Sequence, residues 1–250
     1  MSPNNNIRIL IPDGESHLLI HVLSCLIKLK KYKVYVICSE DENFIRHSRM
    51  VSNFFFYPET DDDNEWIRRI NEQVSKYDID VIMPILPIPI RRLICNKSLL
   101  ADPKKLVALP KLNDYDIASN KWLLYKHLSK NNLRSPETII YNESDREQIV
   151  DFPKVVKPAI GFGGGQQIQL LMNRNDFEVY FLNKSLKETD YILQEYIEGW
   201  DYSCNVLCLN GTILANTIQR SESANNGRFG PQMKYRFETN ERIIELVSEL

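Results

Sequence analysis

Long hydrophobic segments are absent from this 250-residue sequence. No apolar run reaches the ~18 to 20 residues that a membrane-spanning helix needs. The polar start, Met1 to Asn6, has neither the basic segment nor the apolar segment of a signal peptide. These absences predict a cytoplasmic protein that does not use a membrane as a partner.

A dominant charge of one sign is also missing, because 31 basic side chains nearly balance 33 acidic ones. The formal net charge of -2 gives no overall field that would attract nucleic acid or an anionic membrane. A composition of 43% hydrophobic and 26% charged residues excludes disordered and fibrous chains. Ligands must therefore be bound by local sites on one or two packed domains.

Disulfide-forming cysteines are not evident either. The chain has five cysteines, an odd number, and most of them lie within apolar segments. Such positions favour reduced thiols in the core over a disulfide framework. This expectation agrees with a cytoplasmic location.

The N-terminal part alternates between two hydrophobic periods, which predict strands and helices in turn. Apolar runs that predict strands lie at 7–12, 33–38 and 80–85, and helical spacing of apolar residues lies at 19–29 and 65–76. Strands that alternate with helices of this length form a parallel sheet. We therefore expect an α/β architecture that starts with a Rossmann-like domain over residues 1–112.

The first turn of this expected domain carries only Asp13-Gly14. It lacks the glycine triplet that lets a backbone approach a pyrophosphate, so dinucleotide binding is not expected there. Pro84, Pro87 and Pro89 follow the third strand, where regular structure should break. These prolines form either a substrate wall or a rigid turn.

The second part, residues 113–250, has a different pattern. We expect a linker helix at 113–135, capped by Asp116 or Ser119, a glycine-loop subdomain at about 136–196 and the start of a last subdomain at about 197–250. Strands are expected at 154–158, 167–171, 191–196 and from Tyr202, and helices at 176–186 and 241–250. The basic residues Arg220, Arg228, Lys234 and Arg236 are expected in a loop after the last strand.

Glycine is scarce, but its distribution is uneven. Four of the nine glycines, Gly161, Gly163, Gly164 and Gly165, fall within five consecutive positions between two expected strands. Such a loop can turn several backbone N–H groups toward phosphate oxygens, although a plain flexible hairpin tip would have the same composition. Lys157 on the entering strand favours the phosphate interpretation. The loop is not a P-loop, because Gln166 and Gln167 follow it.

Three motifs occur in a suggestive order: Asn120-Lys121 at a helix start, Phe152 to Pro158 followed by the glycine loop, and Ile192 to Tyr202. In this order they resemble the ATP-grasp superfamily, especially its carbamoyl-phosphate-synthase-like and D-alanine-D-alanine-ligase-like members. The resemblance covers residues 113–250. It implies an α+β ATP-grasp domain after the Rossmann-like domain.

The resemblance also implies roles for single residues. Lys121 and Lys157 match the two basic residues that bind the phosphates, and Gly161 to Gly165 match a mobile lid over the triphosphate. The segment Gln194, Glu195, Tyr196 and Ile197 matches the hinge that holds adenine, with Ile197 as the backbone donor and the Gln194 carbonyl as an acceptor. Asp201 matches an acid that accepts from the ribose hydroxyls, or is an exposed turn residue. Arg220 is the one late basic residue that we nominate for the γ-phosphate and acyl substrate.

The family binds Mg²⁺ through late acidic residues and an asparagine, in a pattern resembling Glu-x-Asn-x-Arg. In the resemblance these positions would follow the helix at 241–250, so we expect no metal ligands in this chain and interpret it as a C-terminally truncated, incomplete domain. Phosphoryl transfer relies on Mg²⁺, so the chain alone is expected to turn over poorly.

The implied activity is that of an ATP-dependent ligase that converts an unknown small carboxylate into an acyl phosphate. The competing hypotheses are a nucleotide-binding module without catalysis and a dehydrogenase-like Rossmann protein. The association state stays open, with a homodimer among the options.

Overall fold

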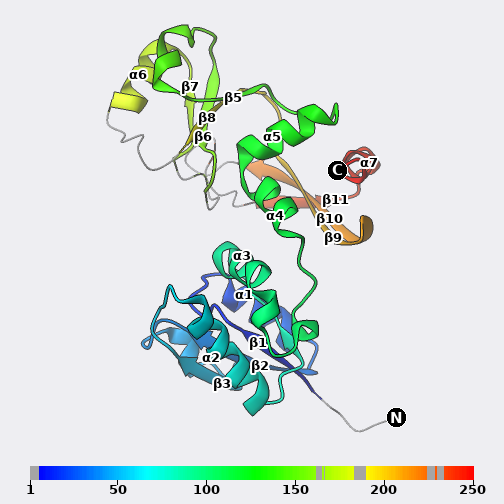
Figure 1. Cartoon of the computed structure of the whole chain (residues 1–250). Helices are drawn as coiled ribbons and strands as arrows, with labels where there is room; N and C mark the ends of the chain where they lie inside the picture. The colour runs from blue at the N-terminus through cyan, green and yellow to red at the C-terminus, as the bar shows by residue number, and fades with distance from the viewer. Residues whose placement is uncertain (1–5, 162–164, 166, 183–189, 224–228, 230–233) are drawn as a thin grey trace. The chain divides into compact units, whose positions relative to one another are not determined.

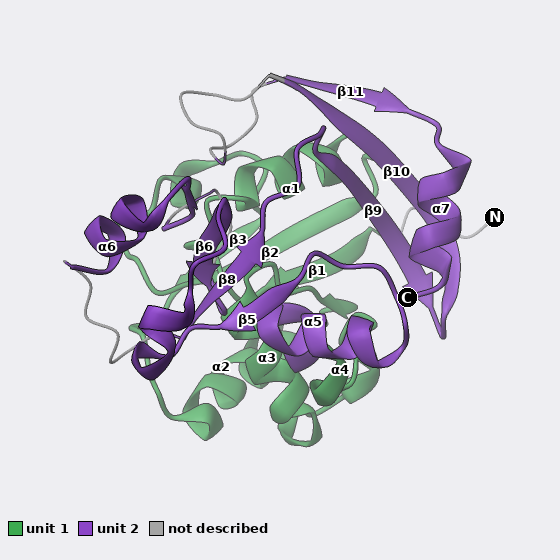
Figure 2. Ribbon diagram, turned by 90° about the horizontal axis from the view of Figure 1, so that it is seen from above, with its two compact units in different colours: residues 1–115 green, residues 116–250 purple. Residues whose placement is uncertain are grey.

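The computed structural model describes residues 6–161, 165, 167–182, 190–223, 229 and 234–250. Within these ranges the chain forms two compact units, Met1–Tyr115 and Asp116–Leu250 (Figures 1 and 2). The architecture is a mixed α/β fold with one parallel sheet and two antiparallel sheets. The expected fold class is confirmed.

Unit 1 contains a four-stranded parallel sheet in the order β3-β2-β1-β4. Alternate residues of each strand enter two separate cores, because successive side chains point to opposite faces. Ile9 and Ile11 pack with α1, whereas Leu10 packs with α2 and α3. The strands are β1 (Ile7–Ile11), β2 (Tyr32–Cys38), β3 (Asn53–Phe56) and β4 (Val81–Ile82), and the helices are α1 (Leu19–Ile27), α2 (Asp63–Lys76) and α3 (Pro87–Cys95).

The expected break in regular structure is present at residues 83–86, which include Pro84, but Pro87 and Pro89 belong to helix α3. Pro87 occupies the first turn of α3, where the missing N–H is not needed by the helix. The Asp13 carboxylate, which follows β1, accepts hydrogen bonds from the N–H groups of Ile85 (2.7 Å) and Leu86 (2.5 Å). A distant side chain therefore provides the cap that the local sequence lacks.

Unit 2 contains two antiparallel sheets, in the orders β5-β8-β6-β7 and β11-β10-β9. The aromatic residues Tyr141, Phe177 and Phe181 form the centre of the core behind the first sheet. The strands are β5 (Thr138–Ile140), β6 (Lys154–Pro158), β7 (Gln169–Leu171), β8 (Tyr191–Glu195), β9 (Tyr202–Leu209), β10 (Thr212–Ser223) and β11 (Lys234–Glu238). The helices are α4 (Leu112–Ser119), which spans the boundary between the units, α5 (Lys121–Lys130), α6 (Arg174–Leu182) and α7 (Glu241–Ser248).

Two details of unit 2 differ from expectation. The linker helix at 113–135 is two helices, because Asn120 has an extended backbone and caps α5, so neither Asp116 nor Ser119 is the cap. The late basic residues are not in a loop: Arg220 lies in β10, and Lys234 and Arg236 lie in β11. Arg228 is outside the described residues.

The cysteines are free, but the expected burial is wrong for most of them. Cys38 is buried, whereas Cys25, Cys95 and Cys208 are exposed and Cys204 is half-buried. Apolar neighbours in sequence did not indicate burial, because the helix or strand turns these positions outward. Short 3₁₀ helices complete the fold at Phe44–His47, Lys97–Leu99, Pro103–Lys105 and Glu143–Gln148.

Candidate functional site

One face of the β5-β8-β6-β7 sheet opens into a cavity of about 560 Å³. The antiparallel register pairs Gln194 with Thr138 on one side and with Val155 on the other, and Lys157 follows Val155 by two residues on the same face of β6. The opposite face, with Val156 and Leu193, belongs to the aromatic core. The lining comprises Pro136, Val155, Lys157, Ile168, Gln194, Glu195, Tyr196, Ile197, Glu198, Gly199, Trp200, Asp201, Ser221 and Phe229.

Lys157 is held at the wall of this cavity. Its Nζ donates to the side-chain carbonyl Oε1 of Gln194 over 2.7 Å. Burial lowers the pKa of Lys157, and the nearby Lys121 ammonium lowers it further. Because burial disfavours the charged form of this ammonium group, an anion bound nearby would stabilise it.

Lys121 is the first residue of α5, where the helix dipole favours anions. Asn120 caps this end by accepting from the N–H groups of Trp122 (2.9 Å) and Leu123 (3.1 Å). The Lys121 N–H donates to the Ala159 carbonyl (2.8 Å) and its Nζ to the Pro158 carbonyl (3.1 Å), which fixes α5 to the end of β6. Burial lowers the pKa of Lys121.

The two lysines share one property that points to a ligand. Within the described residues, neither ammonium forms an ion pair with a carboxylate. Elsewhere in unit 2, cations such as Arg146 and Arg174 pair with Glu178. Two adjacent, partly buried cations without a counter-ion in the described residues would be stabilised by a polyanion bound beside them.

The hinge residues lie together at the end of β8. Gln194, Glu195, Tyr196 and Ile197 all line the cavity, next to the apolar side chains Val155, Ile168 and Phe229. The Ile197 N–H makes no hydrogen bond within the described part of the chain, so it is free to donate to a ligand. The Gln194 carbonyl, expected to accept from adenine, is already engaged by Lys157 and keeps one further lone pair.

Asp201 lines the cavity, whereas Arg220 contacts a residue of the lining, Trp200. Asp201 is exposed, and the Asp201 backbone carbonyl accepts from the N–H of the buried Ser221 (2.9 Å). Arg220 is not among the lining residues. Its guanidinium stacks on the exposed ring of Trp200 at 4.1 Å from the centroid, and its Nε is buried with no hydrogen-bond partner among the described residues.

The glycine loop is only partly described. Gly161 lies close to Lys121, since a Cβ added there would be 4.0 Å from the ammonium nitrogen, and Gly165 has a positive φ of 73°. Gln167, two residues after Gly165, accepts hydrogen bonds from Tyr180 and Tyr191, which anchor the returning strand. Gly163 and Gly164 lie outside the described residues.

Three residues that contribute to this site were not singled out from the sequence. Trp200 and Ser221 line the cavity, and Thr138 binds the side chain of Gln194 from β5. The β-branched run after Pro136 could have indicated a strand for Thr138. Its partner could not be read from the sequence, because the register between β5 and β8 is a tertiary property.

Residues that fit Mg²⁺ are not brought together: within the described ranges no group of three His, Cys, Asp or Glu residues could hold a metal ion. The letters Glu-x-Asn-x-Arg do occur at Glu238 to Arg242, earlier than the resemblance implies. There the Asn240 side chain accepts from the Ile243 N–H and caps α7. These residues do not line the cavity.

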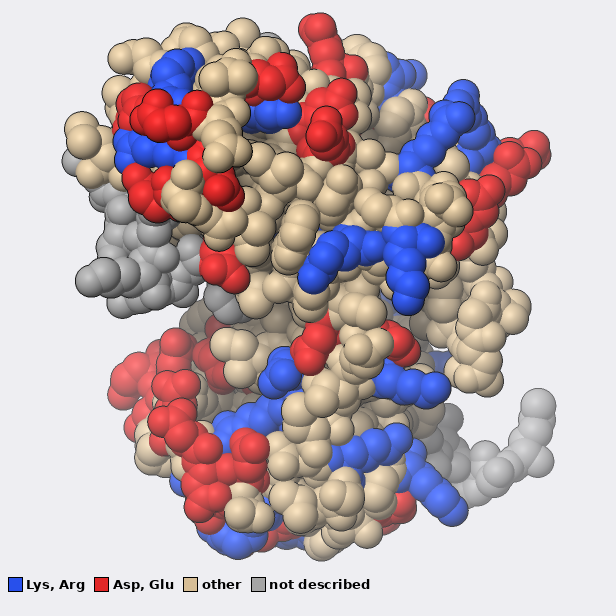
Figure 3. Space-filling model, turned by 45° about the horizontal axis from the view of Figure 1, so that its top comes forward, with Lys and Arg blue, Asp and Glu red and all other residues tan. Residues whose placement is uncertain are grey.

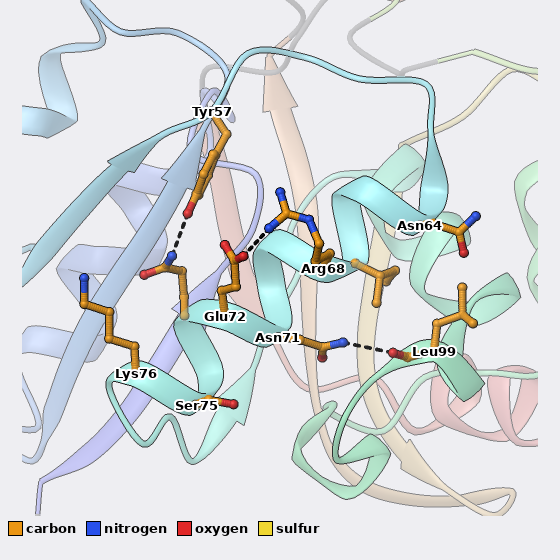
Figure 4. A pocket seen from close by; sticks show the side chains of 10 residues that line it. Tyr57, Asn64, Arg68, Asn71, Glu72, Ser75, Lys76 and Leu99 are labelled. Carbon is orange, nitrogen blue, oxygen red and sulfur yellow. Dashed lines mark hydrogen bonds and ion pairs between the residues drawn. The ribbon is translucent and has the colours of Figure 1, made fainter.

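A larger hollow of about 920 Å³ lies along α2 in unit 1 (Figure 4). Its polar groups are largely paired with one another: Arg68 with Glu72, Asn71 with the Leu99 carbonyl (2.9 Å) and Gln73 with the Tyr57 hydroxyl (2.6 Å). Side chains that already pair with one another have few free donors or acceptors for a ligand. We therefore take the smaller cavity in unit 2 as the candidate site.

The geometry of unit 2 agrees with a family assignment. The ATP-grasp domain family matches residues 118–250, more than half of the chain. This chain belongs to the ATP-grasp family. No match was found among curated proteins.

Solved ATP-grasp structures share the fold of the whole chain. An L-amino acid ligase from Bacillus licheniformis is 17% identical with a TM-score of 0.70, and covers 100% of this chain and 60% of its own. An N5-carboxyaminoimidazole synthetase from Staphylococcus aureus complexed with ADP is 16% identical, with a TM-score of 0.68 and coverage of 100% and 63%.

A biotin carboxylase domain from Hydrogenobacter thermophilus, solved with MgADP and bicarbonate, is 15% identical, with a TM-score of 0.60 and coverage of 97% and 57%. The chain therefore spans about three fifths of the length of these proteins. At such identities the likeness shows the fold alone.

Proposed function

We propose that unit 2 binds ATP in the cavity beside β6 and β8 and belongs to an ATP-dependent carboxylate ligase. The observation that carries the proposal is the pair Lys121 and Lys157, two neighbouring partly buried ammonium groups with no carboxylate partner in the described residues. Solved ATP-grasp structures with ADP support the choice of nucleotide. We also propose that the chain divides into a Rossmann-like domain, residues 1–112, and an ATP-grasp domain, residues 113–250.

Each part of the nucleotide has a proposed set of contacts. Lys121, Lys157 and the amides of the loop Gly161, Gly163, Gly164 and Gly165 bind the phosphates, and Ile197 with the apolar wall binds adenine. Asp201 accepts from the ribose hydroxyls. Arg220, which stacks on Trp200, is proposed to contact the γ-phosphate or the acid substrate.

In the proposed reaction a carboxylate oxygen attacks the γ-phosphorus of ATP, the bond to the β-phosphate oxygen breaks, and ADP leaves. An amine nitrogen then attacks the acyl carbon, releasing phosphate and a proton. The residues of this chain contribute position and positive charge, and no side-chain nucleophile is required. The described residues do not fit Mg²⁺.

The test compares ATP with adenosine. Lys157→Ala should weaken ATP binding by about tenfold to 100-fold, the value of a charge-assisted hydrogen bond, and leave adenosine binding unchanged. Lys154→Ala is the matched control, because Lys154 lies on the same strand, pairs with Asp151 and does not line the cavity. Equal losses for both ligands in calorimetry would refute the phosphate role.

A nucleotide-binding module without catalysis is the second candidate. The observation that favours it is the lack of a metal-binding cluster among the residues described. The two candidates differ in ADP release: a ligase forms ADP from ATP when a carboxylate and an amine are supplied, whereas a module binds ATP unchanged. A cytoplasmic location stays a prediction, and the association state stays open, with a homodimer among the options. No helix in the described part is long and apolar enough to cross a membrane.

A further inference from the structure

A chain of hydrogen bonds leads from the backbone carbonyl of Pro136, two residues before β5, to the ammonium of Lys157. The Thr138 hydroxyl donates to the Pro136 carbonyl (2.9 Å), the Gln194 amide Nε2 donates to Thr138 Oγ1 (2.8 Å), and Lys157 donates to Gln194 Oε1 (2.7 Å). Thr138 is only 2% exposed. The chain therefore runs from a buried anchor to the wall of the cavity.

The direction of every bond in this chain is determined. A carbonyl can only accept, so the single hydroxyl proton of Thr138 points to Pro136. Thr138 Oγ1 must then accept, and the Gln194 amide group must turn its NH₂ toward Thr138. The amide oxygen consequently faces Lys157. The flipped amide would set its NH₂ group against the ammonium and its oxygen against Thr138 Oγ1, whose only proton is donated to Pro136.

A neutral amide has a particular effect on the lysine. The Gln194 carbonyl fixes the Lys157 ammonium through one of its three donors and does not cancel its charge. A carboxylate in this position would form an ion pair and compete with a phosphate. Lys121 is the nearby cation, and Glu195, Glu198 and Asp201 are the acids that line the same cavity.

We propose that Thr138 and Gln194 are positioning residues, which aim Lys157 at the phosphates of a nucleotide and keep its full charge available to them. This inference rests on the proposed function, since it names what sets the phosphate affinity of the same site. The side chain of Gln194 then holds Lys157, and the backbone that follows β8 binds the adenine base.

The first experiment measures the binding of ATP and adenosine to full-length variants by calorimetry. Thr138→Val keeps the shape and removes the acceptor, so ATP affinity should fall about threefold to tenfold while adenosine affinity is unchanged. Thr138→Ser should restore binding. Thr217→Val, an exposed threonine of β10, is the control for the substitution itself. Equal effects on both ligands, or none in Thr138→Val, would overturn the positioning role.

The second experiment needs no nucleotide, so it separates this inference from the proposed function. Titration of the Lys157 side chain by NMR should give a higher pKa in Gln194→Glu, where a carboxylate faces the ammonium, and a lower pKa in Thr138→Val, where the amide is released. Wild-type protein that does not bind ATP would refute the proposed function alone. An unchanged Lys157 pKa in both variants would refute the hydrogen-bond chain.

Discussion

The starts of two helices, α3 in unit 1 and α5 in unit 2, differ in whether the chain itself supplies an anion there. In unit 1 the backbone N–H groups of Ile85 and Leu86, at the start of α3, are occupied by the carboxylate of Asp13. In unit 2 the start of α5 and the end of β6 present two ammonium groups that have no carboxylate partner among the residues described. Unit 1 supplies its own anion at this position, whereas unit 2 leaves two cations that the proposed phosphate ligand would neutralise.

Local charge, and not overall charge, makes this difference. The net charge of -2 is close to neutral, and Figure 3 shows acidic and basic side chains interspersed on the face in view. No field of one sign directs a ligand to either unit. The contrast depends on which few side chains the strands bring to the ends of α3 and α5.

Alanine substitutions at Gly14 in unit 1 and Gly161 in unit 2 should give the largest difference in stability. A Cβ on Gly14 would lie 2.5 Å from Val36 and 2.8 Å from Cys38, whereas a Cβ on Gly161 would meet nothing closer than 3.8 Å. Gly14→Ala should therefore destabilise unit 1 by about 3 kcal/mol through overpacking, while Gly161→Ala should leave stability nearly unchanged. Chemical denaturation of both variants checks the expectation. Equal stability of the two would mean that the Asp13-Gly14 turn is not tightly packed.

The buried acid of unit 1 should make its stability depend on pH. Burial raises the pKa of Asp13 from 3.8 to about 6, although the N–H groups of Leu86 and Ile85 oppose the shift. The folded state then binds the proton more tightly than the unfolded state, so this group's stabilising contribution is full below pH 4 and is lost as the pH rises through 6.

Asp13→Asn isolates this contribution. Relative to the variant, the wild type should lose roughly 2 to 3 kcal/mol of stability between pH 4 and pH 6. Denaturation at a series of pH values measures the difference and cancels the other carboxyls, including Glu15, whose pKa burial also raises. Parallel stability curves for the two proteins would show that Asp13 does not titrate in this range.

Asp201 should give the smallest effect, because its side chain is exposed. If it accepts from the ribose, 2′-deoxy-ATP should bind the wild type about twofold to tenfold more weakly than ATP, and Asp201→Ala should bind both nucleotides alike. Four dissociation constants complete this double-mutant cycle. A discrimination between the nucleotides that survives in Asp201→Ala would remove Asp201 from the site.

Several features followed from local sequence. The strand Lys154–Pro158 was predicted with the bounds that it has, because a β-branched pair sits between lysines and a proline ends the run. The hydrophobic periodicity also predicted α2 and β8, apart from the exact residues at which they begin or end. The β10–β11 pair was missed, since its exposed faces alternate weakly and its many polar residues suggested a loop.

The candidate site was predicted less completely. Lys157, Gln194, Ile197 and Asp201 were nominated through a resemblance, and they do line one cavity. Arg220 was nominated as well, but it reaches the cavity only through its stack on Trp200. Thr138 carried no sequence signal of a role, because nothing in its local segment indicates which strand it will pair with.

The sequence by itself determined the alternation of strands and helices in unit 1, the cluster of glycines and the balance of charge, because periodicity, backbone freedom and charge are properties of neighbouring residues. Only the tertiary structure decided that Asp13 caps α3, 72 residues away, and that Gln194 holds Lys157. Such contacts depend on strand register and on which strands become neighbours, and both are set by burying whole faces of a sheet at once.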